Sequence, residues 1–199
     1  MHKKIFKGGN RGVMETFIFL DVDGVLNNKR HYKKLHKKYG GRFCCEDMPF
    51  NPRSLKNLRK IIDKTKGKVV LSSSWRLSEY CMVVLKARLM EYGIRIFSQT
   101  KRLDGNRGNE INEWLKENAT RTEIVSFSKP DFINMPSHFK VIKHYICLIL
   151  DDEVNDISNR FDYSEVIQTD MEIGLDYWKT REVIKKFNWQ KEVIGSCQK

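Results

Sequence analysis

The sequence has little proline and no hydrophobic run long enough to cross a membrane. Its longest apolar runs, at 17–20 and 146–150, are far shorter than the roughly 18 residues that a transmembrane helix needs. Of the 199 residues, 4 are proline, 40% are hydrophobic and 31% are charged, as in folded globular proteins. The first residues lack the apolar stretch of a secretory signal. We therefore expect one cytoplasmic domain with no membrane partner.

The cysteine pattern argues against a disulfide framework. The 5 cysteines are odd in number and include no pair separated by two residues, which favours a reducing compartment. One grouping, His31, His36, Cys44 and Cys45, resembles a set of metal ligands. Zinc ligands usually come as two tight pairs, and adjacent cysteines are poorly spaced for one ion. Ordinary loop residues are therefore the favoured interpretation, with a zinc site as the alternative.

Acidic residues are missing from two segments, which concentrates the positive charge. Lysine and arginine number 37 against 25 acidic residues, and 11 of the 12 net charges lie in 1–14 and 29–42. In the second segment, Tyr32, Leu35 and Tyr39 fall on one face of a predicted helix and leave the lysines on the other. Such a local patch is suited to binding a polyanion such as nucleic acid. The alternative is a solvated helix face.

Short apolar segments alternate with helical patterns along most of the chain. Strands are predicted at 16–22, 68–71, 94–97, 145–150 and 165–168, and helices at 51–63, 78–92, 109–118 and 175–187. This alternation predicts an α/β fold with a mostly parallel sheet of about five strands, covered on both faces. The expected domain spans 15–190, after a basic arm at 1–14. It carries a basic insertion at 29–50 and a second one, of undetermined structure, at 120–143.

Two carboxylates follow the first predicted strand. Residues two apart in a strand point to the same side, so Asp21 and Asp23 leave its carboxyl end together, and Gly24 allows a sharp turn. Ligands of open α/β sheets bind at that end of the strands. Two adjacent carboxylates repel each other, and a hard cation such as Mg²⁺ relieves the repulsion. A solvated Asp-x-Asp-Gly turn is the structural alternative.

Polar residues also follow two other predicted strands. Asp151 and Asp152 come directly after the strand at 145–150, and Asp156 follows one helical turn later. The strand at 68–71 ends in Ser72, whose hydroxyl and backbone N–H suit a phosphate oxygen. Two acidic strand ends, a hydroxyl and a nearby basic residue together indicate a site for phosphoryl transfer.

These motifs resemble those of the haloacid dehalogenase-like (HAD) superfamily of phosphatases. Its first motif is matched by Asp21, Asp23, Gly24 and Asn27, its second by Ser72, and its fourth by Asp151 and Asp152. For the basic third motif Arg107 is the best match, with Lys101 and Arg102 as rivals. DVDGVLN, SSSWR, RGNEINEWL, LILDDE and IGLD are more closely similar to the compact HAD domains of RNA-repair proteins, and more loosely to polynucleotide kinase-phosphatases. The resemblance implies a Rossmann-like three-layer fold with a minimal cap or none.

The resemblance also implies a role for each matching residue. Asp21 is the expected nucleophile and Asp23 the general acid and base, while Ser72 and Arg107 orient the phosphoryl group. Asp21, the backbone carbonyl of Asp23, and Asp152 are the expected Mg²⁺ ligands, assisted through water by Asp151 or Asp156. The remaining candidates for substrate binding are Gly24, Asn27, Ser73, Arg76, Lys33, Lys34, Lys37 and Lys38.

The expected activity is Mg²⁺-dependent removal of a terminal phosphate, most plausibly a 3′-phosphate, from RNA or DNA. One alternative is the same chemistry on a nucleotide or sugar phosphate, and another is a nucleic-acid-binding module without turnover. Trp75, beside the second motif, is open to two interpretations, packing in the core or stacking on a base. No protein partner is indicated, and we expect a monomer.

Overall fold

The structure is a computed structural model, and its described residues are 14–40, 50–119, 122–127, 138–143 and 145–196. Nearly all of the expected basic arm at 1–14 lies outside them. Cys44 and Cys45, from the candidate zinc grouping, also lie outside them.

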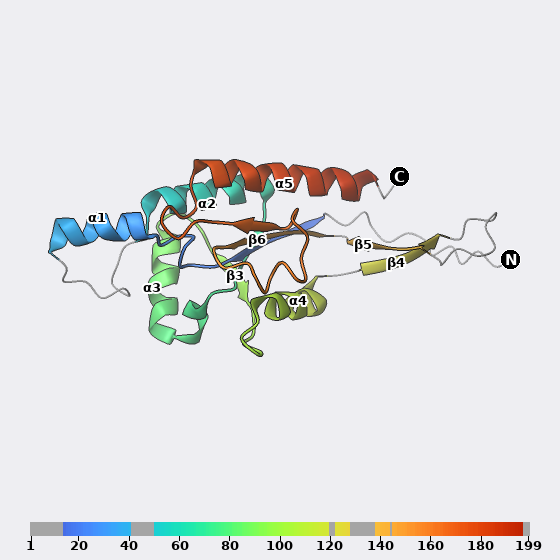
Figure 1. Ribbon diagram of the computed structural model, residues 1–199, viewed down its shortest axis with the longest axis horizontal. Coiled ribbons are helices and arrows are strands. Elements are labelled where there is room, and N and C mark those ends of the chain that lie inside the picture. Colours follow the sequence, from blue (N-terminus) through green and yellow to red (C-terminus); the bar gives the residue numbers. More distant parts are fainter. Residues whose placement is uncertain (1–13, 41–49, 120–121, 128–137, 144, 197–199) are drawn as a thin grey trace.

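Strands and helices alternate as predicted (Figure 1). The strands are β1 (Glu15–Leu20), β2 (Lys68–Leu71), β3 (Ile96–Gln99), β4 (Thr122–Phe127), β5 (His138–Lys143), β6 (Tyr145–Asp151) and β7 (Val166–Gln168). The helices are α1 (Lys29–Tyr39), α2 (Pro52–Thr65), α3 (Glu79–Met90), α4 (Arg107–Asn118) and α5 (Tyr177–Ser196), with a 3₁₀ turn at Ser74–Leu77.

Five strands form one parallel sheet in the order β3-β2-β1-β6-β7. The central strand β1 pairs with β2 and β6, and Leu20 lies opposite Leu71 on one side and Leu150 on the other. Because all strands run in the same direction, their carboxyl ends meet at one edge of the sheet. The first, second and fourth predicted motifs therefore converge there.

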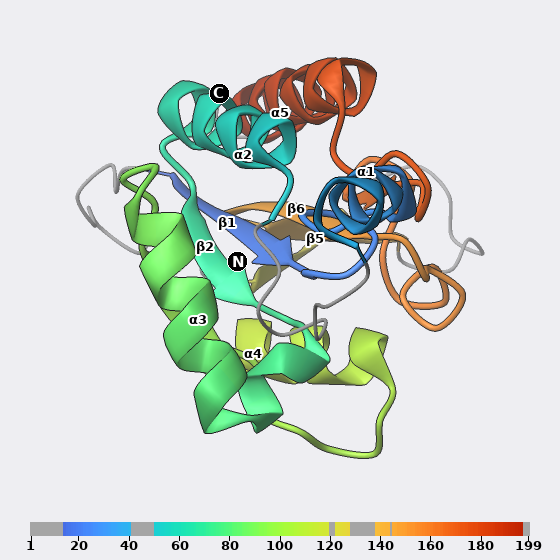
Figure 2. The same ribbon diagram turned by 90° about the vertical axis from the view of Figure 1, so that its left-hand side faces the viewer.

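The alternation of side chains in β1 divides the core into two layers. Ile18 and Leu20 pack in a cluster that includes buried residues of α2, α3 and α5. Phe17 and Phe19 point to the other face, where their rings lie 5.0 and 5.3 Å from the ring of Trp114 in α4. Helices α2 and α5 cover one face of the sheet and α4 lies against the other (Figure 2). The predicted three-layer α/β architecture is confirmed.

Local capping explains several helix starts. Asn51 accepts a hydrogen bond from the backbone N–H of Arg53 at 3.0 Å, with Pro52 in the first turn of α2. Ser78 caps α3 through the N–H of Cys81. Helix α4 begins at Arg107, two residues before the predicted start, because Asn106 accepts a hydrogen bond from the N–H of Asn109. This earlier start places Arg107 in the first turn of the helix.

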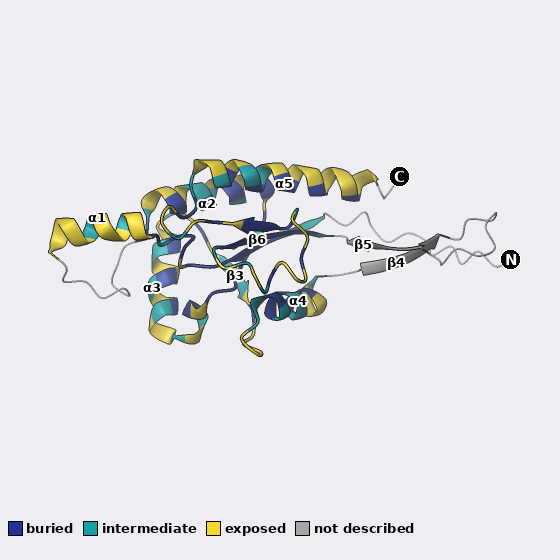
Figure 3. Ribbon diagram, in the orientation of Figure 1, coloured by how far each residue is buried: buried dark blue, intermediate teal, exposed yellow. Residues whose placement is uncertain are grey.

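Two regions differ from an ordinary doubly wound sheet. Residues 120–143, whose structure the sequence leaves open, contain the antiparallel pair β4 and β5, with Thr122 opposite Lys143. Helix α1 projects from the body and has no buried residue (Figure 3).

Among the described helices, none combines the length and hydropathy required to cross a membrane.

Candidate active site

Three polar residues extend the central strands at the carboxyl edge of the sheet. The N–H of Asp21 donates to the carbonyl of Leu150 at 2.9 Å, and the N–H of Ser72 donates to the carbonyl of Leu20 at 2.9 Å. Parallel pairing therefore continues for one residue beyond β1 and β2. Asp21 consequently lies beside Asp151, the last residue of β6, on one side and beside Ser72 on the other.

Asp21, Asp151 and Asp152 form a compact carboxylate cluster. One oxygen from each lies within 4.8 Å of the others. Asp21 and Asp151 are buried, Asp152 is half-buried, and all three line an open cavity of about 610 Å³. Among the described residues, no other group of three acidic, histidine or cysteine side chains is close enough to hold an ion.

Arg107 contacts this cluster from the first turn of α4. Its Nη1 lies 2.9 Å from Oδ1 of Asp21 and 3.1 Å from Oδ2 of Asp151, and it also donates to the carbonyl of Ser72. The backbone N–H of Arg107 donates to Oδ2 of Asp156 at 2.5 Å. Arg107 is therefore anchored through both its backbone and its side chain.

The two rival cations of the third motif lie elsewhere. Lys101 forms an exposed ion pair with Glu117 at 2.6 Å. Arg102 is exposed and is not among the residues that line the cavity. Of the three candidates, the fold brings Arg107 to the carboxylates.

The cluster carries more negative charge than Arg107 neutralises. Burial, reinforced by the charge of Asp21, raises the pKa of Asp151 to about 8 and that of Asp152 to about 6. Burial also raises the pKa of Asp21, although Arg107 and the Ser73 hydroxyl lower it in part. The donor set is entirely carboxylate oxygen, which Mg²⁺ prefers. The three residues therefore fit a divalent cation.

Gly24 makes room for one of these carboxylates. Its φ is +71°, and a Cβ added there would lie 2.2 Å from Cγ of Asp152. A side chain at this position would occupy the space that the Asp152 carboxylate fills. Gly24 therefore permits both the sharp turn of the first motif and the close approach of the Asp152 carboxylate to that turn.

The family comparison agrees with this geometry. A model of the HAD domain in Swiss Army Knife RNA repair proteins matches residues 17–178. The chain belongs to this HAD family. Searches of curated proteins and of solved structures returned no significant match. The matched region runs from β1 to the start of α5 and includes the whole carboxylate cluster and Arg107.

In this HAD domain, the carboxyl group of the second aspartate of the first motif is hydrogen-bonded to neighbouring side chains and is not a member of the carboxylate cluster. One oxygen of Asp23 accepts a hydrogen bond from the indole Nε1 of Trp75 at 2.8 Å, and the other accepts one from Asn27 at 3.3 Å. Asp23 lines the cavity, but its side chain is not part of the carboxylate cluster. The Trp75 ring is buried and lies 5.2 Å from that of Phe50. Trp75 therefore packs in the core and also orients Asp23.

The three serines of the second motif have different environments. Ser72 is buried, and its hydroxyl has no hydrogen-bond partner among the described residues. The Ser73 hydroxyl is hydrogen-bonded to the carboxylate of Asp21, and Ser74 is exposed at the wall of the cavity. An unpaired buried hydroxyl beside Asp21 is a place where a bound oxygen acceptor would complete the hydrogen bonding.

Arg76 is used inside the HAD domain rather than at the cavity. Its guanidinium forms a buried ion pair with Glu110 at 2.5 Å and donates to the carbonyls of Ser73 and Thr100 at 2.6 and 2.9 Å. It is not among the residues that line the active-site cavity. Arg76 therefore holds the Ser73 loop in place through these contacts, and the substrate contact expected from the sequence stays a prediction.

The lysines expected to bind substrate lie on α1, outside the active-site cavity. Lys33, Lys34, Lys37 and Lys38 are all exposed. Lys33 forms an exposed ion pair with Glu172 at 3.2 Å, and Lys34 lines a different pocket. The basic helix projects from the body (Figure 1), and none of its residues lines the active-site cavity.

The cavity also contains residues that the sequence analysis did not identify. Glu153 and Asn155 come directly after the acidic pair of the fourth motif, and their proximity to Asp152 is a usable signal. Met171 lies two residues before IGLD, and this proximity is the signal that could have identified it. Its carbonyl accepts a hydrogen bond from the N–H of Lys29 at 3.0 Å, which holds the segment 171–173 against the start of α1.

Proposed function

We propose that this HAD domain is a Mg²⁺-dependent phosphatase that removes a terminal 3′-phosphate from RNA or DNA. The observation that carries the proposal is the cluster of Asp21, Asp151 and Asp152 in contact with Arg107 at the carboxyl edge of the sheet. The family match to a domain of RNA-repair proteins supports the choice of a nucleic-acid substrate.

Asp21 is suited to be the nucleophile. Its carboxylate lines the open cavity, and hydrogen bonds from Arg107 and Ser73 favour its charged form. An oxygen of Asp21 attacks phosphorus and forms an aspartyl-phosphate, while the bond from phosphorus to the leaving alcohol breaks. Water then attacks phosphorus, the bond from phosphorus to Asp21 breaks, and inorganic phosphate is released.

Asp23 is positioned to move the two protons that this sequence requires. It gives a proton to the leaving oxygen in the first step and takes one from the attacking water in the second. The hydrogen bonds from Trp75 and Asn27 hold its carboxyl group at the cavity wall, apart from the Asp21 cluster. Trp75 and Asn27 are therefore positioning residues for the acid and base.

Asp21, Asp151 and Asp152 would hold Mg²⁺, which supplies positive charge to the phosphoryl oxygens when bound. Arg107 adds a fixed cation that is shared by Asp21 and Asp151 and faces the same cavity. The hydroxyl of Ser72, which is buried beside Asp21 and has no partner among the described residues, is proposed as a donor to a phosphoryl oxygen. These groups stabilise charge in the transition state without further rearrangement.

The test of this function is a panel of substrates with Mg²⁺: 3′- and 5′-phosphorylated oligonucleotides, mononucleotides and p-nitrophenyl phosphate. Asp21→Asn should abolish turnover on every substrate while leaving the thermal transition nearly unchanged, because the two side chains are almost isosteric. Preference for mononucleotides would favour a small-molecule phosphatase. Absence of turnover on every substrate, or substantial Mg²⁺-dependent activity in Asp21→Asn, would contradict the proposal.

The α1 lysines are proposed to contact the polymer. Replacing Lys33, Lys34, Lys37 and Lys38 with alanine should lower kcat/KM for an oligonucleotide relative to that for p-nitrophenyl phosphate. It should also flatten the dependence on salt, since each phosphate contact on a single strand contributes about 0.7 to the slope of log K against log salt. If the ratio of kcat/KM for the oligonucleotide to kcat/KM for p-nitrophenyl phosphate is unchanged, the lysines of α1 do not contact the substrate and form a solvated helix face.

A further inference from the structure

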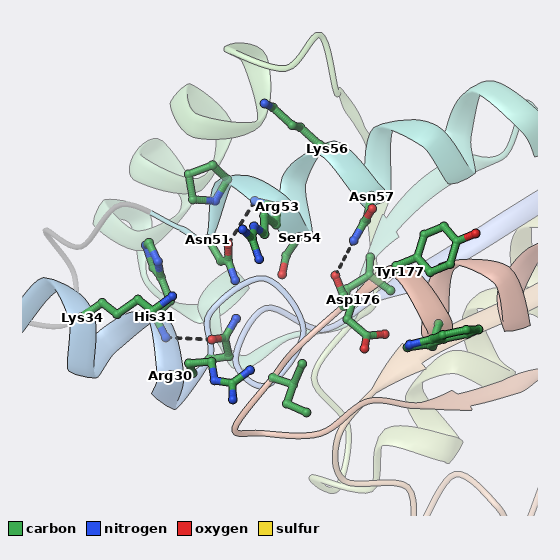
Figure 4. Close-up of a pocket in the computed structure, with 15 residues that line it drawn as sticks. Arg30, His31, Lys34, Asn51, Arg53, Ser54, Lys56, Asn57, Asp176 and Tyr177 are labelled. Atoms are coloured by element: carbon green, nitrogen blue, oxygen red, sulfur yellow. Dashed lines mark hydrogen bonds between the residues drawn. The ribbon is translucent and has the colours of Figure 1, made fainter.

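A second pocket lies between α1, α2 and the start of α5 (Figure 4). Its volume is about 670 Å³, and none of its lining residues belongs to the carboxylate cluster. The pocket is formed where three helices begin, so the positive ends of their dipoles lie around it. A helix start is not a site by itself, and the side chains in the pocket decide what it binds.

The rim of the pocket is positively charged. Among the described residues that line it are four cations, Arg30, Lys34, Arg53 and Lys56, and one carboxylate, that of Asp176. All four cations are exposed, and none forms an ion pair within the described part of the chain. Their charge is therefore available to an anionic ligand.

The floor of the pocket holds two hydrogen-bond donors that no acceptor in the described part of the chain satisfies. Ser54 is fully buried, and its hydroxyl points from α2 into the space between α2 and the segment that leads to α5 (Figure 4). That hydroxyl and Nδ2 of Asn28 have no hydrogen-bond partner among the described residues. The other amide atom of Asn28, Oδ1, already accepts from the N–H of His31 at 2.9 Å. Buried donors that lack a partner are rare, and an anionic oxygen would satisfy them.

Two aromatic rings stand beside the cations. Tyr177 and Trp178 line the pocket, are 51% and 69% exposed, and have ring centroids 5.3 Å apart. Exposed adjacent aromatic rings next to a basic groove are the combination that binds single-stranded nucleic acid, because bases stack on the rings while the cations follow the backbone.

The pocket also adjoins the active site. The short segment 171–173 contributes Met171 to the active-site cavity and Ile173 to this pocket. Hydrogen bonds from the N–H groups of Lys29 and Arg30 to the carbonyls of Met171 and Glu172 hold that segment in place. A nucleic-acid strand bound with its end at Asp21 would therefore lie next to this basic, aromatic pocket, because the segment 171–173 borders both cavities.

The geometry points to this pocket as the binding site for a nucleoside phosphate of a single-stranded nucleic acid, a few nucleotides from the phosphorylated end. The phosphodiester lies between the exposed cations and the unpaired donors of Ser54 and Asn28, and a base stacks on Trp178. The choice of nucleic acid over another polyanion rests on the proposed function.

The test measures binding without turnover, so that it stands apart from the phosphatase assay. A fluorescein-labelled single-stranded oligonucleotide of 12 nucleotides with a free 3′-hydroxyl is titrated with the full chain in EDTA, and anisotropy is followed at several salt concentrations. Arg53→Ala combined with Lys56→Ala should weaken binding by about tenfold and lower the salt slope by about 1.4, the value for two phosphate contacts. Trp178→Ala should weaken binding by at least about fivefold.

A matched control removes the same charge elsewhere. Lys64→Ala combined with Lys86→Ala removes two exposed lysines, one at the far end of α2 and one on α3, and should change the affinity by less than about twofold. If both double variants weaken binding equally, net charge alone drives binding, and the assignment of this pocket as the binding site is refuted. An unchanged affinity in the pocket variant would overturn it as well.

A competition experiment separates a polymer from a small anion. Inorganic phosphate at millimolar concentration should not displace the oligonucleotide, whereas an unlabelled oligonucleotide should. Displacement by phosphate alone would identify a small-anion site and overturn the proposal. If the wild type binds the oligonucleotide through this pocket but hydrolyses no phosphorylated substrate, the binding site stands and the proposed function fails.

Discussion

Substituting Gly24 with alanine should weaken the metal site although every carboxylate residue is kept. The added Cβ would lie 2.2 Å from Cγ of Asp152, whereas carbon atoms in contact are normally about 3.5 Å apart. The carboxylate must therefore move by more than about 1 Å. Mg²⁺ binds its oxygen ligands at about 2.1 Å in a demanding octahedral geometry, so a displacement of this size removes Asp152 from the coordination sphere.

The backbone cost of the substitution can be separated from the loss of the ligand. Gly24 has a φ of +71°, which costs about 1 kcal/mol for a residue with a Cβ, or about 2–4 °C in melting temperature for a domain of this size. Gly40, at the end of α1, has a φ of +70° and no described atom within 4 Å of an added Cβ. Gly40→Ala is therefore a control with the same backbone cost and no displaced carboxylate.

The expected readout is the Mg²⁺ dependence of the melting temperature. Losing one anionic ligand should raise the Mg²⁺ concentration for half-saturation by at least about tenfold, or about 1.4 kcal/mol. At a concentration a hundredfold above the wild-type Kd, Mg²⁺ stabilises the wild type by about 2.7 kcal/mol. A tenfold weaker site would retain about half of this stabilisation.

The comparison between the two glycine variants decides the outcome. Both should melt a few degrees below the wild type in EDTA, and only Gly24→Ala should lose part of the Mg²⁺-dependent stabilisation. Equal half-saturation in the wild type and Gly24→Ala would refute the assignment of Asp152 as a ligand held in place by the glycine.

Three further predictions concern the cluster. Asp152→Asn should raise the Mg²⁺ requirement for activity more than Asp151→Asn does, because Asp151 is already paired with Arg107; the reverse order would exchange their roles. In EDTA, the melting temperature should fall as pH rises from about 5 to 8. The pKa is raised to about 6 for Asp152 and about 8 for Asp151, so the native state retains protons that the unfolded state, in which these pKa values are near 3.8, has already lost. Saturating Mg²⁺, or removal of both carboxyl groups, should flatten this dependence on pH. Arg107→Ala should lower kcat by about a hundredfold or more. Arg107→Lys should retain most of the wild-type kcat, because a single nitrogen, Nη1, makes all three side-chain contacts of Arg107. Equal activity of the two variants would exclude a role for the charge.

The division of the domain into strands and helices could be predicted because its causes are local. The apolar runs of β1 and β6 and the capping residues Asn51 and Ser78 act over a few neighbours in the chain, and each appears in the expected element. The carboxylates were also predictable, since a parallel sheet brings the ends of β1 and β6 to one edge whatever the surrounding loops do.

The remaining features depend on contacts between distant segments, which have no local signature. Only the tertiary structure distinguishes Arg107 from Lys101 as the cation at Asp21, because both are basic residues near the start of α4. It likewise turns Arg76 inward to Glu110 and sets Trp75 against Asp23. The pocket between α1, α2 and α5 arises from residues more than a hundred positions apart. The sequence alone shows the positive charge of segment 29–42. Only the packing of the starts of α1, α2 and α5 places two of its cations, Arg30 and Lys34, in one pocket with Ser54 and Trp178.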